Sequence, residues 1–253
     1  KYKKKAANIK GPEFGEEEMV FPKSKGPRKV RILQKHAVYA AMVEAMDLAV
    51  GKVLAKLDEL GLEDEVVVCF TSDNGGLSTS EGSPTSNLPL RGGKGWLYEG
   101  GIRVPCVVRW KGHIAAGTVS ERITGFEDWM PTLADFAGNG TVPKGIDGIS
   151  FAPTLLGRTQ LERPFLYREF PAYRGQQSIR VGDWKAVRQN LIPRGKEKPV
   201  IKTELYNLKN DYAEMHDVST QHPKIVTKLE SLMGKHRTVS KEFPFPILDN
   251  AVQ

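Results

Sequence analysis

The feature that most constrains the fold is a run of five apolar residues, 66–70, that stops abruptly at a polar segment. A short continuous run of this kind, rich in valine, predicts a strand buried on both faces, as in a parallel sheet covered by helices. The run is followed by Ser-Asp-Asn-Gly-Gly at 72–76. The side-chain oxygens of Asp73 and Asn74 are therefore expected at the C-terminal edge of a strand, where open α/β sheets bind ligands.

Adjacent carboxylate and carboxamide oxygens are hard donors suited to Ca²⁺ or Mg²⁺. By itself, however, Asp-Asn-Gly-Gly is more often a turn after a strand. Gly75 and Gly76 allow a sharp turn and a close approach to a bound group. Further along, Lys94 lies between glycines, which places a cation in a tight loop that can face an anion.

The flanking segments predict an α/β fold in two parts, 1–160 and 161–253. Apolar residues recur at helical spacing over 37–60, and a helix, loop and strand in succession form the α/β repeat. Residues 1–35 lack periodicity and are predicted to be an irregular surface segment. A final helix over 223–237 is expected to pack on a small antiparallel sheet. Short alternating segments between turns predict the strands of that sheet, at 165–170, 177–181, 184–188 and 204–208.

The composition narrows the possible partners. The chain has 253 residues and a formal net charge of +7. No apolar run is long enough for a membrane span, no signal peptide is visible, and no nucleic-acid-binding motif occurs. The positive charge is interpreted as solvated surface, with attraction to an anionic polysaccharide as the alternative. Cys69 and Cys106 lie in apolar runs and are predicted to be buried, free thiols.

Three segments carry a family resemblance. They are Ser-Asp-Asn-Gly at 72–75, Arg-Gly-Gly-Lys-Gly at 91–95, and Tyr-Glu-Gly-Gly-Ile-Arg-Val-Pro at 98–105. In this order and spacing they resemble the type I sulfatases, the arylsulfatase-like branch of the alkaline-phosphatase superfamily. The resemblance implies a partial sulfatase-like sheet with helices, followed by a small antiparallel sheet with a packed helix. It makes the first part the C-terminal portion of the catalytic α/β domain and the second an α+β subdomain.

The implied activity is hydrolysis of sulfate monoesters by a formylglycine nucleophile, with Ca²⁺ (or Mg²⁺) and cationic side chains stabilising charge. Asp73 and Asn74 match the second pair of metal ligands, and Lys94 matches the lysine that contacts the sulfate. Asn rather than His at position 74 favours the sulfatase over the phosphatase branch. Three further residues are substrate-facing candidates by family position, with plain surface charge as the alternative: Arg168, Glu169 and Arg174.

The nucleophile motif of the family, Cys or Ser followed by x-Pro-x-Arg, is missing from this sequence. Residues 87–91 have the same spacing, but Asn87 cannot become formylglycine, so we interpret the match as coincidence. The resemblance implies that the nucleophile and the first metal-ligand pair belong to an N-terminal half of the domain. That half is an expected partner, and this chain alone is expected to be inactive.

Two alternative functions stay open on the sequence alone. One is a phosphomonoester or phosphonate hydrolase of the same superfamily, and the other is a non-catalytic module that binds sulfated glycans. The expected ligand is a sulfated small molecule or glycan. The resemblance implies a periplasmic, secreted or lysosome-like location.

Overall fold

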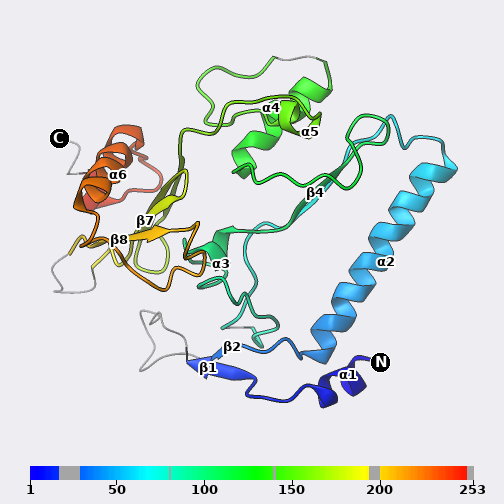
Figure 1. The fold of residues 1–253 in the computed structure, drawn as a ribbon, viewed down its shortest axis with the longest axis horizontal. Coiled ribbons are helices and arrows are strands. Elements are labelled where there is room, and N and C mark those ends of the chain that lie inside the picture. Colours follow the sequence, from blue (N-terminus) through cyan, green and yellow to red (C-terminus); the bar gives the residue numbers. More distant parts are fainter. Residues whose placement is uncertain (17–28, 80, 139–140, 194–199, 250–253) are drawn as a thin grey trace. The chain divides into compact units, whose positions relative to one another are not determined.

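The computed structural model describes residues 1–16, 29–79, 81–138, 141–193 and 200–249 (Figure 1). The chain forms two compact units, each assembled from segments that are distant in sequence. We call them unit 1 and unit 2. Unit 1 comprises Lys1–Ala45, Ser72–Val104 and Tyr167–Gln253, and unit 2 comprises Met46–Thr71 and Pro105–Leu166. The sequence-based domain boundary at residue 160 stays a prediction.

The C-terminal part of the chain forms a four-stranded sheet in the order β5-β6-β7-β8. The pairs β6–β7 and β7–β8 are antiparallel. Helix α6 (Pro223–His236) contacts β6 and β7 and buries Leu229 and Met233. The predicted antiparallel sheet with a C-terminal helix packed on it is therefore confirmed. The strands are β5 (Leu166–Phe170), β6 (Gln176–Val181), β7 (Trp184–Arg188) and β8 (Thr203–Asn207).

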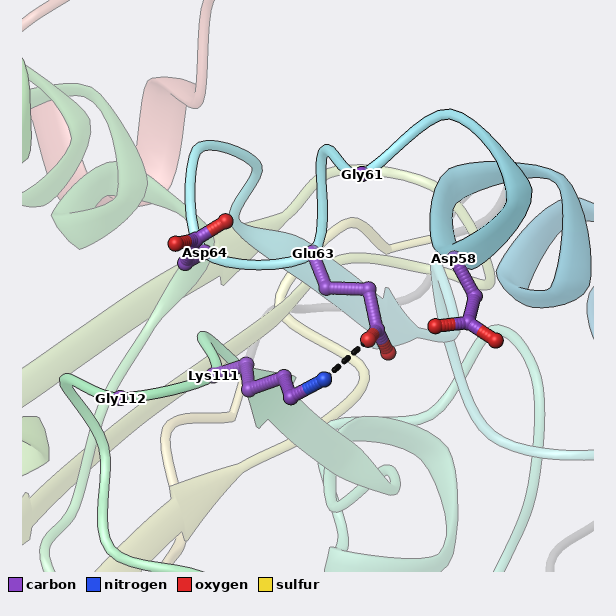
Figure 2. A pocket seen from close by; sticks show the side chains of 6 residues that line it. All are labelled: Asp58, Gly61, Glu63, Asp64, Lys111 and Gly112. Atoms are coloured by element: carbon purple, nitrogen blue, oxygen red, sulfur yellow. Dashed lines mark hydrogen bonds and ion pairs between the residues drawn. The ribbon is translucent and has the colours of Figure 1, made fainter.

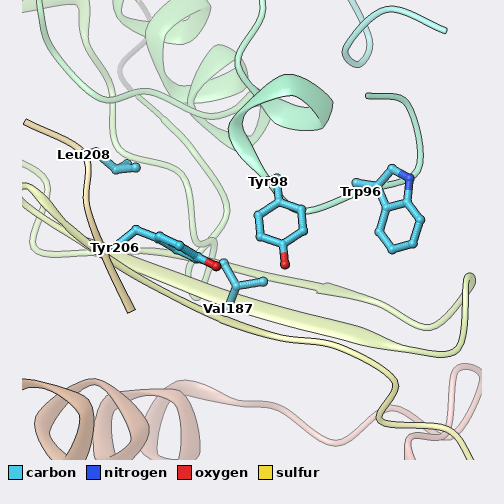
Figure 3. Packing of buried hydrophobic residues seen from close by; sticks show 5 residues of the cluster. All are labelled: Trp96, Tyr98, Val187, Tyr206 and Leu208. Atoms are coloured by element: carbon cyan, nitrogen blue, oxygen red, sulfur yellow. The ribbon is translucent and has the colours of Figure 1, made fainter. Parts of the chain in front are cut away.

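A buried aromatic cluster joins this sheet to the loop before helix α3 (Glu99–Ile102) (Figure 3). Trp96 and Tyr98 come from the loop, and Val187 and Tyr206 come from strands β7 and β8. The Tyr98 and Tyr206 rings meet edge to face, with their centroids 6.2 Å apart. Because aromatic pairs of this geometry bury large apolar surfaces, the sheet fixes the loop that precedes α3.

Helix α2 (Ala37–Glu59) confirms the predicted long helix, yet none of its residues is buried. Its apolar side chains instead lie at the surface. Those exposed are Val38, Met42, Val43, Met46, Leu48 and Val53. A helix with this much uncovered apolar surface needs a packing partner to be stable, because most helical stability in proteins comes from a buried face.

The prediction that residues 66–70 form a strand buried in a parallel sheet is wrong for this structure. Strand β3 (Val68–Thr71) pairs antiparallel with β4 (Cys106–Arg109), and Cys69 and Phe70 are exposed. Cys69 and Cys106 are free, as predicted, but both are exposed rather than buried. The physical reason is that a two-stranded sheet leaves both of its faces open. Apolar composition indicates a strand that can be covered, without specifying what covers it.

The N-terminal segment is more ordered than its sequence predicts. It contains α1 (Tyr2–Asn8) and an antiparallel pair, β1 (Phe14–Glu16) with β2 (Lys29–Arg31). Elements this short fall below the window in which hydrophobic periodicity can be read. Among the described residues, no helix has both the length and the apolar character needed to cross a membrane. The remaining elements are η1 (Phe126–Asp128), α4 (Trp129–Phe136), α5 (Ala152–Leu155) and α7 (Pro246–Asp249).

Candidate functional site

Glycines bring three backbone segments of unit 1 into direct contact. A Cβ placed on Gly75 would lie 1.7 Å from the carbonyl oxygen of Gly100, and one on Gly101 would lie 2.0 Å from that of Trp96. The Gly75 N–H donates to the Gly101 carbonyl at 2.9 Å. These glycines therefore serve the approach of one backbone to another, which is closer than any side chain permits. The sequence predicted that Gly75 would approach a bound group; the structure places the Gly100 backbone against it.

The same packing sets residues 91–98, which we call the Lys94 loop, beside the loop that begins with Asp73. The Lys94 N–H donates to the Gly76 carbonyl at 3.2 Å. Gly92 and Gly95, on either side of Lys94, have φ values of 75° and 93°, a left-handed conformation that strongly favours glycine. Two predicted site segments, separated in sequence, are thus joined by a backbone hydrogen bond.

Arg91 anchors the start of the Lys94 loop to the C-terminal sheet. Its guanidinium lies 4.0 Å from the centre of the Tyr98 ring and donates to the Tyr206 hydroxyl at 2.7 Å. It also donates to the Glu214 carbonyl oxygen at 3.0 Å. Burial, followed by the nearby charge of Glu204, raises the pKa of Tyr98 and of Tyr206 above the ordinary value. Both hydroxyls therefore stay protonated and donate to the Glu204 carboxylate.

A buried ionic cluster holds helix α3 at the other end of the loop. The Lys185 ammonium lies 2.9 Å from a Glu99 carboxylate oxygen and 2.8 Å from a Glu214 carboxylate oxygen. The second Glu214 oxygen accepts the Glu99 N–H at 2.6 Å. Burial raises the pKa of the Glu214 carboxyl, and the Lys185 charge opposes that shift. A buried cluster of this kind penalises the loss of any one member, because the others are left as uncompensated charges.

Gln176 fixes the middle of the Lys94 loop. Its fully buried carboxamide donates to the Gly95 carbonyl at 2.8 Å and accepts the Leu97 N–H at 3.0 Å. Lys94 itself is exposed, and so is Asp73. Within the described part of the chain, neither the Asp73 carboxylate nor the Lys94 ammonium takes part in an ion pair. The result is an exposed cation and an exposed anion on backbone that is held from several directions.

The donors at positions 73 and 74 suit a hard cation but form only part of a site. Asp73 offers an exposed carboxylate, and Asn74 is half-buried. Ca²⁺ takes about six to eight oxygen ligands, so two side chains leave most positions to other groups. Among the described residues, no group of three or more His, Cys, Asp or Glu side chains is arranged to hold a metal. The metal-ligand assignment of Asp73 and Asn74 stays a prediction.

The three substrate-facing candidates lie on β5 and the turn that follows it. Glu169 accepts a hydrogen bond from the Arg237 guanidinium at 2.7 Å and another from the Tyr167 hydroxyl. Arg168 donates to the Tyr167 carbonyl at 2.8 Å. Arg174 has a φ of 70° in the turn before β6. Neighbouring groups hold Arg168 and Glu169, and the substrate-facing role of all three residues stays a prediction.

Unit 2 has a pocket of about 430 Å³ lined by Asp58, Glu63, Asp64 and Lys111 (Figure 2). The Glu63 carboxylate is paired with Lys111, whose ammonium is drawn toward it in Figure 2, and with Arg109. These two cations lower the pKa of Glu63 to about 2. Glu63 is thus an ionic link between the loop after α2 and the end of β4, and its charge is already neutralised.

Comparison with known families agrees with the site motifs. The family model described as "Sulfatase" matches residues 1–139, which is more than half of the chain. The chain belongs to the sulfatase family. A second model, described as "N-sulphoglucosamine sulphohydrolase, C-terminal", matches residues 93–239. The two matches overlap over residues 93–139, a range that includes Lys94 and helix α3.

Relatives of this sulfatase-family chain include several named enzymes. It is 43% identical over 161 residues to steryl-sulfatase of Mus musculus, and 38% identical over 144 residues to arylsulfatase A of Homo sapiens. These alignments cover 60% and 56% of the chain but only 25% and 28% of the relatives. The chain therefore spans about a quarter of the length of the curated relatives it matches.

Solved sulfatase structures resemble this chain in fold as well as in sequence. A sulfatase from Pseudoalteromonas sp. superposes with a TM-score of 0.62 at 29% identity, covering 81% of this chain and 43% of that one. A protein solved in complex with its substrate, D-glucosamine-2-N,6-O-disulfate, superposes with a TM-score of 0.61 at 26% identity. That match covers 76% of this chain and 38% of the other. The predicted class, a partial sulfatase-like α/β fold, is confirmed.

Proposed function

We propose that the full-length protein hydrolyses sulfate monoesters and that this chain supplies Lys94, Asp73 and Asn74 to the active site. The observation that carries the proposal is the hydrogen bond from the Lys94 N–H to the Gly76 carbonyl. It sets the exposed cation of Lys94 on the loop next to the exposed carboxylate of Asp73, and neither is ion-paired among the residues that the structure describes. Membership of the sulfatase family supports the assignment of this pair to sulfate chemistry.

In this proposal, each residue has a role that follows from its charge. The Lys94 ammonium stabilises the negative charge that develops on the sulfate oxygens as the ester bond breaks. The oxygens of Asp73 and Asn74 would hold Ca²⁺ (or Mg²⁺). When bound, the cation polarises a sulfate oxygen as a Lewis acid. The anchored loop keeps Lys94 in place, so little reorganisation is needed during the reaction. A formylglycine nucleophile would come from outside this chain.

The proposed substrate class is a sulfated small molecule or glycan. The names of the relatives cover steryl and N-acetylgalactosamine-6 sulfatases as well as arylsulfatase A, so they do not select one substrate. The substrate of one solved neighbour is a disulfated glucosamine. Arg168, Glu169 and Arg174 are the proposed substrate-facing residues. We place the protein in a periplasmic, secreted or lysosome-like compartment on the same family basis.

The proposed partner of this chain is the N-terminal half of its own catalytic domain. Helix α2 supports this proposal, because it exposes apolar side chains along its length and buries none. The length relation supports it too, since the chain covers 43% of the Pseudoalteromonas sulfatase. Polypeptide equivalent to the uncovered part of that structure is the proposed cover for α2.

The test is turnover of an aryl sulfate by the full-length protein and its Lys94→Ala variant. Removing one charge-stabilising donor is expected to lower kcat by about 10²–10³-fold. Lys209→Ala, which removes an exposed lysine from the turn after β8, is the matched control and should keep full activity. Equal activity of wild type and Lys94→Ala would contradict the proposed role. A phosphate ester hydrolysed in preference to the sulfate ester would contradict the proposed reaction.

A further inference from the structure

We propose that Asn87 is a positioning residue that sets the Lys94 loop against the Asp73–Asn74 loop. This inference rests on the proposed function for its catalytic meaning. In the sequence, Asn87 stands out only through a coincidental match to the spacing of a nucleophile motif. The structure shows its carboxamide between the two segments that carry the site residues.

The carboxamide satisfies three backbone groups at once. Its Oδ1 accepts the Gly76 N–H at 2.9 Å, and its Nδ2 donates to the Gly76 carbonyl at 2.8 Å. The same Nδ2 donates to the Gly92 carbonyl at 3.1 Å. Asn87 therefore pairs with both polar backbone groups of Gly76, as a neighbouring strand would, and also reaches the residue two positions before Lys94.

Gly76 and Gly93 pack so closely against the Asn87 carboxamide that neither position has room for a side chain. A Cβ on Gly76 would lie 2.6 Å from Asn87 Oδ1, and one on Gly93 would lie 2.7 Å from Asn87 Nδ2. The Gly76 carbonyl also accepts the Lys94 N–H. The Gly76 carbonyl thus accepts hydrogen bonds from both the Asn87 carboxamide and the Lys94 N–H. Displacement of the carboxamide is therefore expected to shift the Lys94 backbone.

The segment that carries Asn87 is itself anchored. The Arg31 guanidinium donates to the Ser83 carbonyl at 2.5 Å. Gln34 donates to the Thr85 hydroxyl at 2.8 Å and to the Ser86 carbonyl at 2.9 Å. These bonds tie residues 83–86 to the segment around β2. Asn87 therefore connects the two site loops to a third, fixed part of unit 1.

Only a carboxamide has the required groups in one short side chain. A carboxylate of the same size keeps the acceptor for the Gly76 N–H but has no donor when ionised. In Asn87→Asp, a charged oxygen would face the carbonyl oxygens of Gly76 and Gly92, which is repulsive. The matched control is Asn207→Asp, because the Asn207 carboxamide oxygen accepts the Lys209 N–H at 3.2 Å. That variant changes the charge equally and keeps the acceptor.

The first arm of the test measures amide hydrogen exchange in residues 1–253. Asn87→Asp should speed exchange at the Gly76 and Lys94 amides by about tenfold or more, through local opening of their hydrogen bonds. Asn207→Asp should leave both amides unchanged. Unchanged exchange in Asn87→Asp would overturn the inference. If Asn87→Asp does not fold, Asn87→Gln, which keeps the carboxamide but displaces it, is measured against the same expectation.

The second arm uses the full-length protein and a double-mutant cycle on aryl sulfate turnover. Asn87→Asp should lower kcat by about 10–100-fold with little change in KM, since it acts on charge stabilisation in the transition state. In the Lys94→Ala background, adding Asn87→Asp should lower kcat little further. Losses that multiply independently would show a merely structural role and overturn the inference. If wild type lacks sulfatase activity, the proposed function fails, while the exchange arm still decides whether Asn87 holds the two loops together.

Discussion

At the scale of single residues, the glycines of the site loops set how closely the backbones approach. Gly75 and Gly100 do not have positive φ values, yet neither has space for a Cβ. A side chain at Gly75 would meet a backbone carbonyl, which cannot move aside as the end of a flexible side chain can. The glycines are therefore part of the packing that joins the Asp73 loop to helix α3.

We predict that Gly75→Ala destabilises the chain by at least about 1–3 kcal/mol, the usual cost of overpacking. Gly51→Ala is the control, because a Cβ at this position in α2 meets nothing within 4 Å. Alanine in a helix interior is favoured over glycine by about 0.5–1 kcal/mol, so this variant should be slightly more stable. Urea unfolding of both variants measures the difference. Equal stabilities of Gly75→Ala and wild type would contradict the packing argument.

The sequence indicates candidate site residues where they lie within one motif, and it does not indicate residues that pair across the chain. Asp73 and Lys94 stand in recognisable segments, and the structure brings those segments together. Gln176 and Lys185, in contrast, lie far along the sequence from the loop they hold. Their types alone do not indicate a role, because a buried glutamine or lysine is identified only by what surrounds it. The same holds for Asn87, whose partners come from two other segments.

At the scale of elements, Glu63 links the loop after α2 to the end of β4. Arg109 and Lys111 lower its pKa from 4.5 to about 2, with Lys111 the larger cause. A carboxyl with a depressed pKa in the folded state stabilises the fold above its unfolded-state pKa. That contribution is lost as pH falls from about 4.5 through about 2.

We therefore predict that Glu63→Gln flattens the acid limb of the stability curve. Wild type should lose stability between about pH 4.5 and pH 2 more steeply than the variant, because the variant has no carboxyl to protonate at this position. Glu65→Gln, which removes an exposed carboxylate two residues away, should follow the wild-type profile. Thermal unfolding at a series of pH values measures this. Identical acid limbs for wild type and Glu63→Gln would contradict the assigned link.

Element prediction was reliable where periodicity extends over many residues or where turns delimit alternating segments. Helices α2 and α6 and strands β5 to β8 lie close to their predicted positions. The pairing of β3 was wrong, because an apolar run does not specify its partner or its direction. Helix α1 and strands β1 and β2 were missed, since three to seven residues carry too few apolar positions to show a period.

At the scale of the whole molecule, we propose one explanation for the uncovered helix α2 and for the small number of oxygen donors beside Asp73 and Asn74. Both are expected if this chain is completed by further polypeptide of the same catalytic domain. Met42, with 62% of its surface exposed, and Val38, with 61%, would then be packing residues. The proposal links a packing observation to a chemical one, so one comparison can test them together.

The comparison is between residues 1–253 and the full-length protein. Residues 1–253 should show no turnover of an aryl sulfate, with or without added Ca²⁺, because no Cys or Ser stands in the Cys/Ser-x-Pro-x-Arg motif. Partial desolvation raises the pKa of the Cys69 and Cys106 thiols, although both residues are exposed, and this lowers their nucleophilic thiolate fraction. When catalytic residues act as a unit, loss of the nucleophile removes nearly all of the reaction rate, even where substrate still binds.

The amides of helix α2 provide the second readout of that comparison. They should exchange faster in residues 1–253 than in the full-length protein, because a covered apolar face adds the stability of its burial to each helical hydrogen bond. The amides of β7, which lies in the interior of the four-stranded sheet, should exchange alike in both and serve as the control. Normal enzymatic turnover by residues 1–253 would refute the prediction that this chain lacks the nucleophile. Equal exchange along α2 would refute the proposed cover, because a helix that buries nothing in either protein has gained no partner.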